Sequence, residues 1–213
     1  MSRRQPATRS NSYGLAKRAL DIAGALAGLV LFAPVMLGAA VYIFVDMGLP
    51  LLFRQKRTGI RGEIFTILKF RTMREGANLP DAARLTPAGA LLRSLSIDEL
   101  PQLWNVLRGE MSLVGPRPLM PEYVPHYGER QRRRLDVKPG ITGWAQVSGR
   151  NTLDWEEKFS LDVWYVDHAS FRVDLVILLK TVGKVLRRDG ISEMGQATAT
   201  GFCPADFNGC EAQ

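Results

Sequence analysis

Two adjacent acids near the middle of the chain are the residues best suited to chemistry. Asp98 and Glu99 occur in RSLSIDELPQ, where an apolar pattern with helical spacing begins at Leu100 and continues through Leu103 and Leu107. Carboxylates at a helix start lie at the positive end of its dipole, which keeps them ionised and also attracts phosphate. An ionised carboxylate can attack phosphorus, and its neighbour can hold Mg²⁺ together with phosphate oxygens. The pair therefore indicates phosphoryl transfer, although such a pair is often only a helix cap.

The start of this helix has two possible arrangements. Ser96 and Glu99 have the S-x-x-E spacing of a capping box. Alternatively, Asp98 is the N-cap, which places Pro101 in the first turn, where proline loses no hydrogen bond. Gly109 is well placed to end the helix in both cases.

Basic side chains elsewhere could complete a phosphate site. Lys69 and Arg71 lie in LKFRTM, Arg93 opens RSLSIDELPQ, and Arg117 lies in GPRP. Arginine suits bidentate phosphate recognition, and a proline-flanked arginine loses less conformational entropy on binding. We expect all four to contact substrate phosphates and to stabilise charge during phosphoryl transfer. A single surface arginine is, however, more often part of an ordinary ion pair.

A long apolar segment precedes these residues. Ile22–Val45 contains 24 residues without a charge, which is long enough for a transmembrane helix. Pro34 divides it into pieces of 12 and 11 residues and disfavours helical geometry at Ala33. At ~1.5 Å per residue, each piece covers about half of a ~30 Å hydrocarbon core. The pattern leaves open a re-entrant helix bent at Ala33 and Pro34, a single kinked span, and a buried helix of a soluble protein.

Charges on both sides of the segment favour re-entry. Basic residues favour the cytoplasmic side of a membrane, and a helix that enters and leaves one leaflet keeps both ends on that side. The basic residues are Arg3, Arg4, Arg9, Lys17 and Arg18 before the segment, and Arg54, Lys56 and Arg57 after it.

Composition restricts the class of protein. The chain has 213 residues, of which 46 % are hydrophobic and 23 % charged, so it suits one globular domain and excludes wholesale disorder or a multi-span transporter. The net charge of +7 implies an anionic partner, such as nucleic acid, an anionic membrane or a phosphorylated substrate. Two cysteines, Cys203 and Cys210, exclude a disulfide framework, and we expect free thiols rather than a pair. We assign no catalytic role to His126 or His168.

The remaining patterns predict a small mixed domain with short strands and several helices. The expected strands are Leu49–Gln55 and Ile64–Phe70, joined by a basic turn. The expected helices are Thr86–Arg93, Leu153–Asp167 and Phe171–Arg188. The expected loops are Gly76–Ala82, the proline-rich Val114–Pro125 and, with some strand, Pro139–Gly149.

The last predicted helix is amphipathic. One side is apolar and the other basic, which suits a helix on an anionic membrane surface, although an ordinary helix with a solvated basic end fits equally well. The apolar residues are Leu175, Leu178, Leu179, Val182 and Leu186, and the basic residues are Lys180, Lys184, Arg187 and Arg188.

Jointly, these motifs resemble the bacterial sugar transferase family, also called monotopic phosphoglycosyl transferases. The resemblance covers roughly Lys17 to Arg188 and rests on KRALD, the proline-broken apolar segment, GLPLLFRQKRTG, FTILKFRTM, LRSLSIDELPQLWNVLRGEMSLVGPRPL, and KPGITGWAQVSGRN followed by WEEKFSLDVWYV. It implies transfer of a sugar-1-phosphate from a UDP-sugar to undecaprenyl (polyprenyl) phosphate, with release of UMP. This reaction initiates polysaccharide or glycoconjugate assembly at the cytoplasmic face of the bacterial inner membrane.

The resemblance also implies residue roles. Asp98 would attack the phosphate next to the sugar and form a covalent phosphosugar-aspartyl intermediate, and Glu99 would bind Mg²⁺. Arg93 and Arg117 would contact phosphate, and the Pro34 segment would be a re-entrant membrane helix. Three positions depart from the commonest family pattern without touching the acidic pair, namely Ala33, Glu110 and Ser148.

We therefore predict a mostly helical α+β protein. Its parts are a flexible basic arm (1–16), a re-entrant membrane helix (17–48), a cytoplasmic catalytic domain with interfacial amphipathic helices (49–189) and a poorly ordered tail (190–213). The expected partners are a UDP-sugar, undecaprenyl phosphate and inner-membrane lipids, and a homodimer is compatible with the sequence. We do not expect nucleic-acid binding, despite RQRRR at 130–134, because it leaves the apolar segment without a role. A non-catalytic membrane scaffold is the other alternative.

Overall fold

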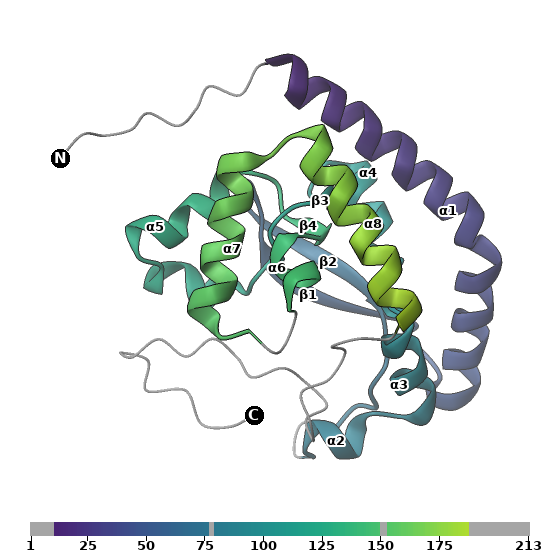
Figure 1. Cartoon of the computed structure of the whole chain (residues 1–213). Coiled ribbons are helices and arrows are strands. Elements are labelled where there is room, and N and C mark those ends of the chain that lie inside the picture. The colour runs from purple at the N-terminus through teal and green to yellow at the C-terminus, as the bar shows by residue number, and fades with distance from the viewer. Residues whose placement is uncertain (1–10, 77–78, 150–152, 188–213) are drawn as a thin grey trace.

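The computed structural model describes residues 11–76, 79–149 and 153–187 (Figure 1). The predicted tail at 190–213, with Cys203 and Cys210, lies outside the described residues, as does most of the predicted arm. The described chain is already helical at Asn11, six residues before the predicted boundary at residue 17. The prediction of a mostly helical protein with short strands is confirmed.

Helix α1 (Asn11–Met47) is a single helix of 37 residues that bends around one side of the molecule (Figure 1). Pro34 lies inside it, and the helix continues on both sides. The predicted break at Ala33 and Pro34 is therefore wrong at the level of secondary structure. A proline removes one backbone hydrogen bond and crowds the preceding turn, and a long helix can absorb this by curving.

The two ends of α1 pack on the domain, whereas its middle does not. Near the start, Ala25 is fully buried with residues of α4 (Gln102–Arg108), and near the end Ile43 is fully buried against Phe70 and Leu92. All six residues of Val30–Val35 are exposed. By length and composition α1 could cross a bilayer, and only 11 % of its most apolar window is buried. The alternative of a helix buried in a soluble core is therefore wrong.

An antiparallel hairpin forms the larger of two small sheets. Strands β1 (Leu52–Thr58) and β2 (Ile64–Phe70) pair from Leu52 opposite Phe70 to Thr58 opposite Ile64. The strand prediction is confirmed, except that β1 begins three residues later and continues into the predicted turn. The outer edge of β2 is covered by Asn105 of α4, which donates to Thr66 O at 2.8 Å and accepts from Leu68 N at 3.1 Å. This side chain satisfies edge groups that would otherwise be open to pairing with another chain.

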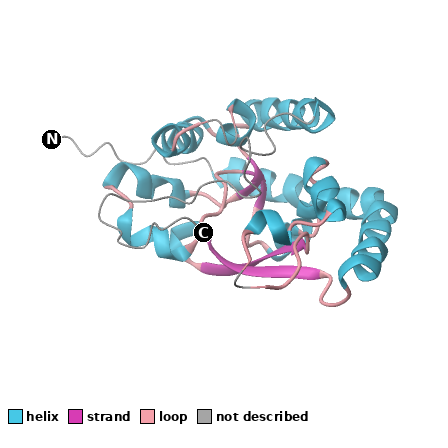
Figure 2. Cartoon of the chain, turned by 90° about the horizontal axis from the view of Figure 1, so that it is seen from below, coloured by secondary structure: helices cyan, strands magenta, loops and turns pink. Residues whose placement is uncertain are grey.

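The helices with the clearest sequence signals are confirmed. Thr86 caps α3 (Pro87–Ser94) by accepting a hydrogen bond from Gly89 N at 3.0 Å, and Gly109 ends α4 in the left-handed conformation with φ 85°. The last two predicted helices are α7 (Trp155–His168) and α8 (Phe171–Arg187). In Figure 2 the helices lie above and to either side of the strands, and the hairpin runs along the lower edge of the view.

Several short elements were not predicted. The first two expected loops overlap α2 (Asp81–Arg84) and a 3₁₀ helix at Pro121–His126, and the third contains α6 (Trp144–Ser148). Helix α5 (Glu129–Arg132) and the 3₁₀ helix η4 (Arg133–Asp136) follow the proline-rich segment. Proline fits the first turn of such helices, which is why a proline-rich stretch can still be helical. Strands β3 (Ser112–Val114) and β4 (Gly140–Thr142) pair in parallel, and a Cβ on Gly140 would lie 2.1 Å from Gly115 N. Only glycine permits this backbone approach.

Candidate active site

The acidic pair lies on a 3₁₀ turn, η2 (Ile97–Glu99), between α3 and α4. Neither predicted cap forms. Ser96 precedes the turn in the left-handed region with φ 55° and makes no capping side-chain hydrogen bond, and the N-cap of α4 is Pro101. The acids thus lie on a separate turn before α4 rather than at its N-cap, and a left-handed non-glycine residue such as Ser96 costs on the order of 1 kcal/mol. Such strain is typical of a functional turn rather than a simple cap.

Glu99 is held by two cations. Its Oε1 accepts a hydrogen bond from Lys69 Nζ at 2.7 Å and from Arg117 Nη2 at 3.1 Å. Burial alone would raise the pKa of Glu99, but the charges and hydrogen bonds of Lys69 and Arg117 outweigh it and hold the pKa well below its usual range. Glu99 is therefore ionised at every physiological pH.

Asp98 is buried in a different electrostatic setting. Its residue surface is 8 % exposed, and no described side chain or backbone amide donates a hydrogen bond to its carboxylate. Burial, and then the charge of Glu99, raise the pKa of Asp98 to about 6, while Lys69, Arg93 and Arg117 oppose the rise. At neutral pH the carboxylate is mostly ionised yet poorly solvated, which is the state that favours nucleophilic attack.

Arg93 joins this group from the last turn of α3. Its Nε donates to Thr72 Oγ1 at 2.9 Å, and its charge acts on Asp98. The helix is fixed against Thr72 by direct backbone contact, since a Cβ on Gly89 would lie 1.9 Å from Thr72 O. The structure thus brings together Asp98, Glu99, Lys69, Arg93 and Arg117.

Arg71 is not brought to the acidic pair. Its guanidinium donates to three carbonyls at the C-terminal end of α1, those of Met47, Gly48 (2.7 Å) and Leu49 (3.3 Å). An arginine suits this place because the last carbonyls of a helix lack partners and carry partial negative charge. The structure therefore gives the predicted phosphate-binding Arg71 a different position, where it joins α1 to the end of β2.

Two arginines near the site were not singled out from the sequence. Arg57 of β1 is half-buried, and desolvation, followed by the charge of Arg117, lowers its pKa to about 10. Arg134, from the basic run RQRRR, is 4 % exposed and pairs with Asp162 at 2.7 Å. Within this basic run, Arg134 therefore lies in the protein interior rather than on the surface. Strand register could have indicated Arg57, which lies on the face of the hairpin that also carries Lys69.

The donor set can be compared with the needs of Mg²⁺. Among the described residues there is no group of three or more His, Cys, Asp or Glu side chains that could hold a metal. Mg²⁺, however, commonly binds one or two carboxylates and takes its other ligands from water and substrate phosphate. Lys69 and Arg117 occupy Oε1 of Glu99, and no described group bonds Oε2. The free Oε2 of Glu99 therefore fits a Mg²⁺ ion that would bind together with the substrate phosphates.

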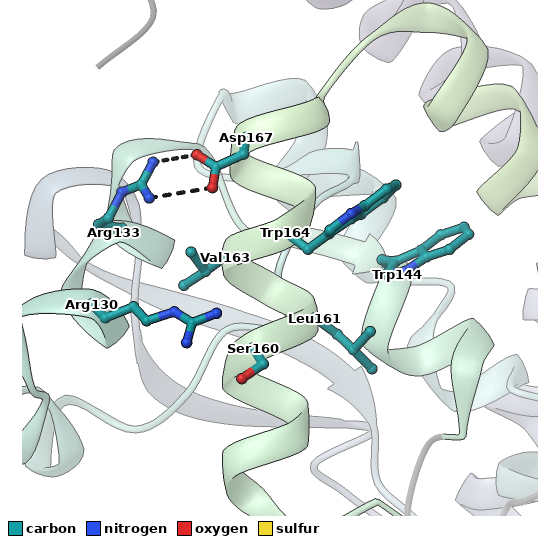
Figure 3. A pocket seen from close by; sticks show the side chains of 8 residues that line it. All are labelled: Arg130, Arg133, Trp144, Ser160, Leu161, Val163, Trp164 and Asp167. Carbon is teal, nitrogen blue, oxygen red and sulfur yellow. Dashed lines mark hydrogen bonds and ion pairs between the residues drawn. The ribbon is translucent and has the colours of Figure 1, made fainter. Parts of the chain in front are cut away.

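A separate pocket of about 550 Å³ lies on the outer side of α7 (Figure 3). It is lined by Arg130, Arg133, Trp144, Ser160, Leu161, Val163, Trp164 and Asp167, and contains none of the site residues. Arg133 and Asp167 form an exposed ion pair at its edge.

Comparisons with known proteins show which family the chain resembles. Residues 12–188 match the family described as bacterial sugar transferase. The chain is 51 % identical over 191 residues to the uncharacterized sugar transferase EpsL of Bacillus subtilis, covering 87 % of this chain and 95 % of EpsL. It is 43 % identical over 190 residues to the UDP-glucose:undecaprenyl-phosphate glucose-1-phosphate transferase of Caulobacter vibrioides, covering 82 % and 71 %. For the undecaprenyl-phosphate galactose phosphotransferase of Salmonella typhimurium the identity is 36 % over 196 residues, covering 82 % of this chain but 41 % of the relative.

Proposed function

The chain belongs to the bacterial sugar transferase family and is a transferase, and from this we propose that it moves a sugar-1-phosphate from a UDP-sugar to undecaprenyl phosphate, releasing UMP. The observation that carries the proposal is the buried Asp98, which has no hydrogen-bond donor among the described residues and lies beside cations that suit a diphosphate. Two relatives carry undecaprenyl-phosphate in their names, and one of these names specifies UDP-glucose.

The proposed reaction has two displacements at one phosphorus atom. An ionised Asp98 oxygen attacks the phosphate next to the sugar, and the bond to the bridging oxygen of the diphosphate breaks, so UMP leaves with that oxygen. An oxygen of undecaprenyl phosphate then attacks the same phosphorus, and the bond to Asp98 breaks. The products are undecaprenyl-diphosphate sugar and the free carboxylate.

The neighbouring residues supply charge for these steps. Arg93 and Arg117 would contact the phosphate oxygens, on which negative charge increases in the transition state. Lys69 and Arg117 fix Glu99, whose Oε2 would hold Mg²⁺. When bound, the metal neutralises phosphate charge and orients the diphosphate.

For α1 we propose re-entry into one leaflet rather than a span. Lys17 Nζ lies 2.7 Å from Asp174 Oδ2, and Arg18 donates to Val106 O at 2.6 Å, while Arg71 binds the other end of the helix. A helix that crosses a ~30 Å core puts its ends on opposite sides of the membrane, yet here both ends bond to the same domain. The exposed apolar stretch Val30–Val35 would be the part that enters lipid.

Helix α8 would lie on the same membrane surface. Its Asp174 and Ile177 face the domain, whereas Leu175, Leu179 and Val182 are exposed. An apolar side turned away from the domain favours the interfacial alternative over an ordinary solvated helix. Together with the proposed insertion of α1, this orientation would put the acidic pair at the cytoplasmic face of the inner membrane, where a soluble nucleotide sugar and a lipid phosphate could both reach it.

The direct experiment is a UMP-release assay with purified protein, Mg²⁺, undecaprenyl phosphate and a panel of UDP-sugars. We expect repeated turnover with at least one sugar, at most one UMP per chain when undecaprenol replaces undecaprenyl phosphate, and no UMP when the UDP-sugar is left out. Absence of turnover with the whole panel would contradict the proposed UDP-sugar donor.

The membrane arrangement predicts a labelling pattern. In a variant whose Cys203 and Cys210 are replaced by serine, Gly14→Cys and Glu63→Cys each put an exposed thiol at one end of the membrane segment. Re-entry predicts that a membrane-impermeant thiol reagent labels neither in intact cells and both after permeabilisation. Labelling of Gly14→Cys alone in intact cells would indicate a span.

The activity should depend on the ionisation of Asp98. Because its pKa is raised to about 6, mainly by burial, and only the carboxylate attacks phosphorus, kcat/KM for UMP release should fall roughly tenfold between about pH 7 and pH 5. A flat profile over this interval would argue against Asp98 as the nucleophile.

A further inference from the structure

The GPRP segment is fixed carbonyl by carbonyl. Pro116 and Pro118 have no N–H, so their backbone can form hydrogen bonds only through the carbonyl oxygens, which accept them. Four successive carbonyls each accept from a different partner: Pro116 O from Gly140 N (2.9 Å), Arg117 O from Arg134 Nη2 (2.6 Å), Pro118 O from Arg57 Nη1 (3.4 Å) and Leu119 O from Thr58 N (2.9 Å).

The charged side chain that holds the Arg117 carbonyl is itself fixed by a buried ion pair. Arg134 Nη2 also donates to Asp162 Oδ2 at 2.7 Å, and Nη1 donates to Tyr127 Oη at 3.0 Å. The side chains of Arg134 and Asp162 are 3 % and 5 % exposed. One guanidinium thus joins α7, Tyr127 and the backbone of the site arginine.

A gain in folding stability does not by itself explain why a buried ion pair such as Arg134–Asp162 is present. Removing two charges from water offsets most of their attraction, and apolar residues of similar volume are often equally stable or more so. Arg117, by contrast, needs a defined backbone position, because its side chain is 49 % exposed and must still reach Glu99 at 3.1 Å.

We propose that Arg134 and Asp162 are positioning residues, which hold the Arg117 carbonyl so that the Arg117 guanidinium meets Glu99 and the substrate phosphates. The role in catalysis rests on the function proposed above, whereas the placement of Arg117 does not. Charge-assisted hydrogen bonds are the stronger and shorter ones, which suits a fixed anchor.

The test removes the anchor while keeping a packed interior. Arg134→Met with Asp162→Leu should fold, with a Tm near or above that of the wild type, but kcat for UMP release should fall roughly tenfold to hundredfold with a smaller change in KM. Arg133→Met with Asp167→Leu is the matched control, since this exposed pair joins the same two elements, η4 and α7 (Figure 3). The control should keep wild-type kcat.

A double-mutant cycle separates positioning from general damage. In an Arg117→Ala background the Met/Leu pair should reduce kcat less than twofold further, because no guanidinium remains to be placed. An equal reduction in both backgrounds, or unchanged kcat in the wild-type background, would overturn the proposal. If the Met/Leu variant does not fold, Arg134→Lys replaces it in the cycle, because lysine keeps the charge beside Asp162 but lacks the planar fork.

A structural readout is independent of turnover. In an experimental structure of the folded anchor variant, Arg117 should leave Glu99, whereas an intact Arg117–Glu99 contact would overturn the proposal. A wild-type protein that releases no UMP would count against the proposed function, and this structural comparison would still decide the positioning role.

Discussion

Asp98→Asn is expected to abolish UMP release and at the same time to stabilise the protein. Asparagine keeps the shape of the side chain but cannot form the acyl-phosphate bond, so turnover should fall more than about 10⁴-fold. Wild-type protein with a UDP-sugar and no lipid phosphate should release at most one UMP per chain and gain the mass of a sugar phosphate. The variant should do neither.

The gain in stability follows from the direction of the pKa shift. Burial and then Glu99 raise the pKa of Asp98 from 3.8 to about 6, so the ionised form is less favourable in the folded state than in the unfolded chain. Above about pH 6 this costs the wild type on the order of 1–3 kcal/mol, and the cost disappears as the pH falls below the unfolded pKa. Asparagine carries no charge at any pH. The Tm of the variant should therefore rise by several degrees at neutral pH and match the wild type near about pH 4.

The control for this prediction is Asp167→Asn, which neutralises an exposed carboxylate on α7, 69 positions after Asp98 in the sequence. It should keep wild-type activity and stability within about 0.5 kcal/mol. Full function in Asp98→Asn would favour a non-catalytic scaffold, and lost activity with an unchanged Tm would contradict the electrostatic account.

The acidic pair and most of its partners could be predicted from local patterns. Asp98 and Glu99 stand in a short motif, and Arg117 in a stiff one, so their chemistry could be inferred before their positions were known. The hairpin and the helices α3, α4, α7 and α8 were predicted because their periodicity or capping is local. The turn geometry at Ser96 was not, since a left-handed serine has no sequence signature.

Arg71 shows where local reasoning fails. Lys69 and Arg71 are two residues apart, so in a continuing strand both would point to one face. Strand β2 ends at Phe70, however, and the alternation ends with it. Beyond that point the partner is decided by the end of α1, which is 22 to 24 residues earlier in the chain and unrelated in sequence pattern.

The basic run at Arg133 and Arg134 shows the same limit in tertiary packing. The two are adjacent and of one residue type, yet Arg133 pairs with the exposed Asp167 and Arg134 with the buried Asp162. Which arginine enters the interior depends on how η4 crosses α7. No spacing within RQRRR contains that information.

The basic residues before the membrane segment have a second use that charge counting did not indicate. Membrane topology depends only on the sign of these charges, whereas their contacts in the fold depend on geometry: Lys17 pairs with Asp174, and Arg18 donates to the carbonyls of Val106 and Leu107 near the end of α4. Arg71 does the same for the end of α1. Cations at both ends therefore bond α1 to the domain, and the same positive charge favours the cytoplasmic side.

Glu99→Gln is expected to lower kcat by roughly 10²- to 10³-fold, although Glu99 forms no covalent bond in the proposed reaction. Glutamine preserves the size of the side chain but removes the negative charge that both cations contact. In the wild type, Glu99 Oε1 lies 2.7 Å from Lys69 Nζ and 3.1 Å from Arg117 Nη2. The two cations would then repel each other beside Asp98, and the oxygen proposed for Mg²⁺ would become a neutral amide. The Mg²⁺ concentration for half-maximal rate should rise at least about tenfold.

The stability of this variant should change in the opposite direction to that of Asp98→Asn. Lys69 and Arg117 hold the pKa of Glu99 well below its usual range, so the ionised form stabilises the folded state above the unfolded pKa, and this contribution is lost as the pH falls. Glu99→Gln should therefore lower the Tm at neutral pH. Glu75→Gln, with a side chain that is 82 % exposed, is the matched control and should alter neither Mg²⁺ dependence nor Tm. If the two substitutions shift Tm in opposite directions, they support a division of roles in which Asp98 is a destabilised nucleophile and Glu99 a stabilised anchor. Shifts of the same sign would contradict this division.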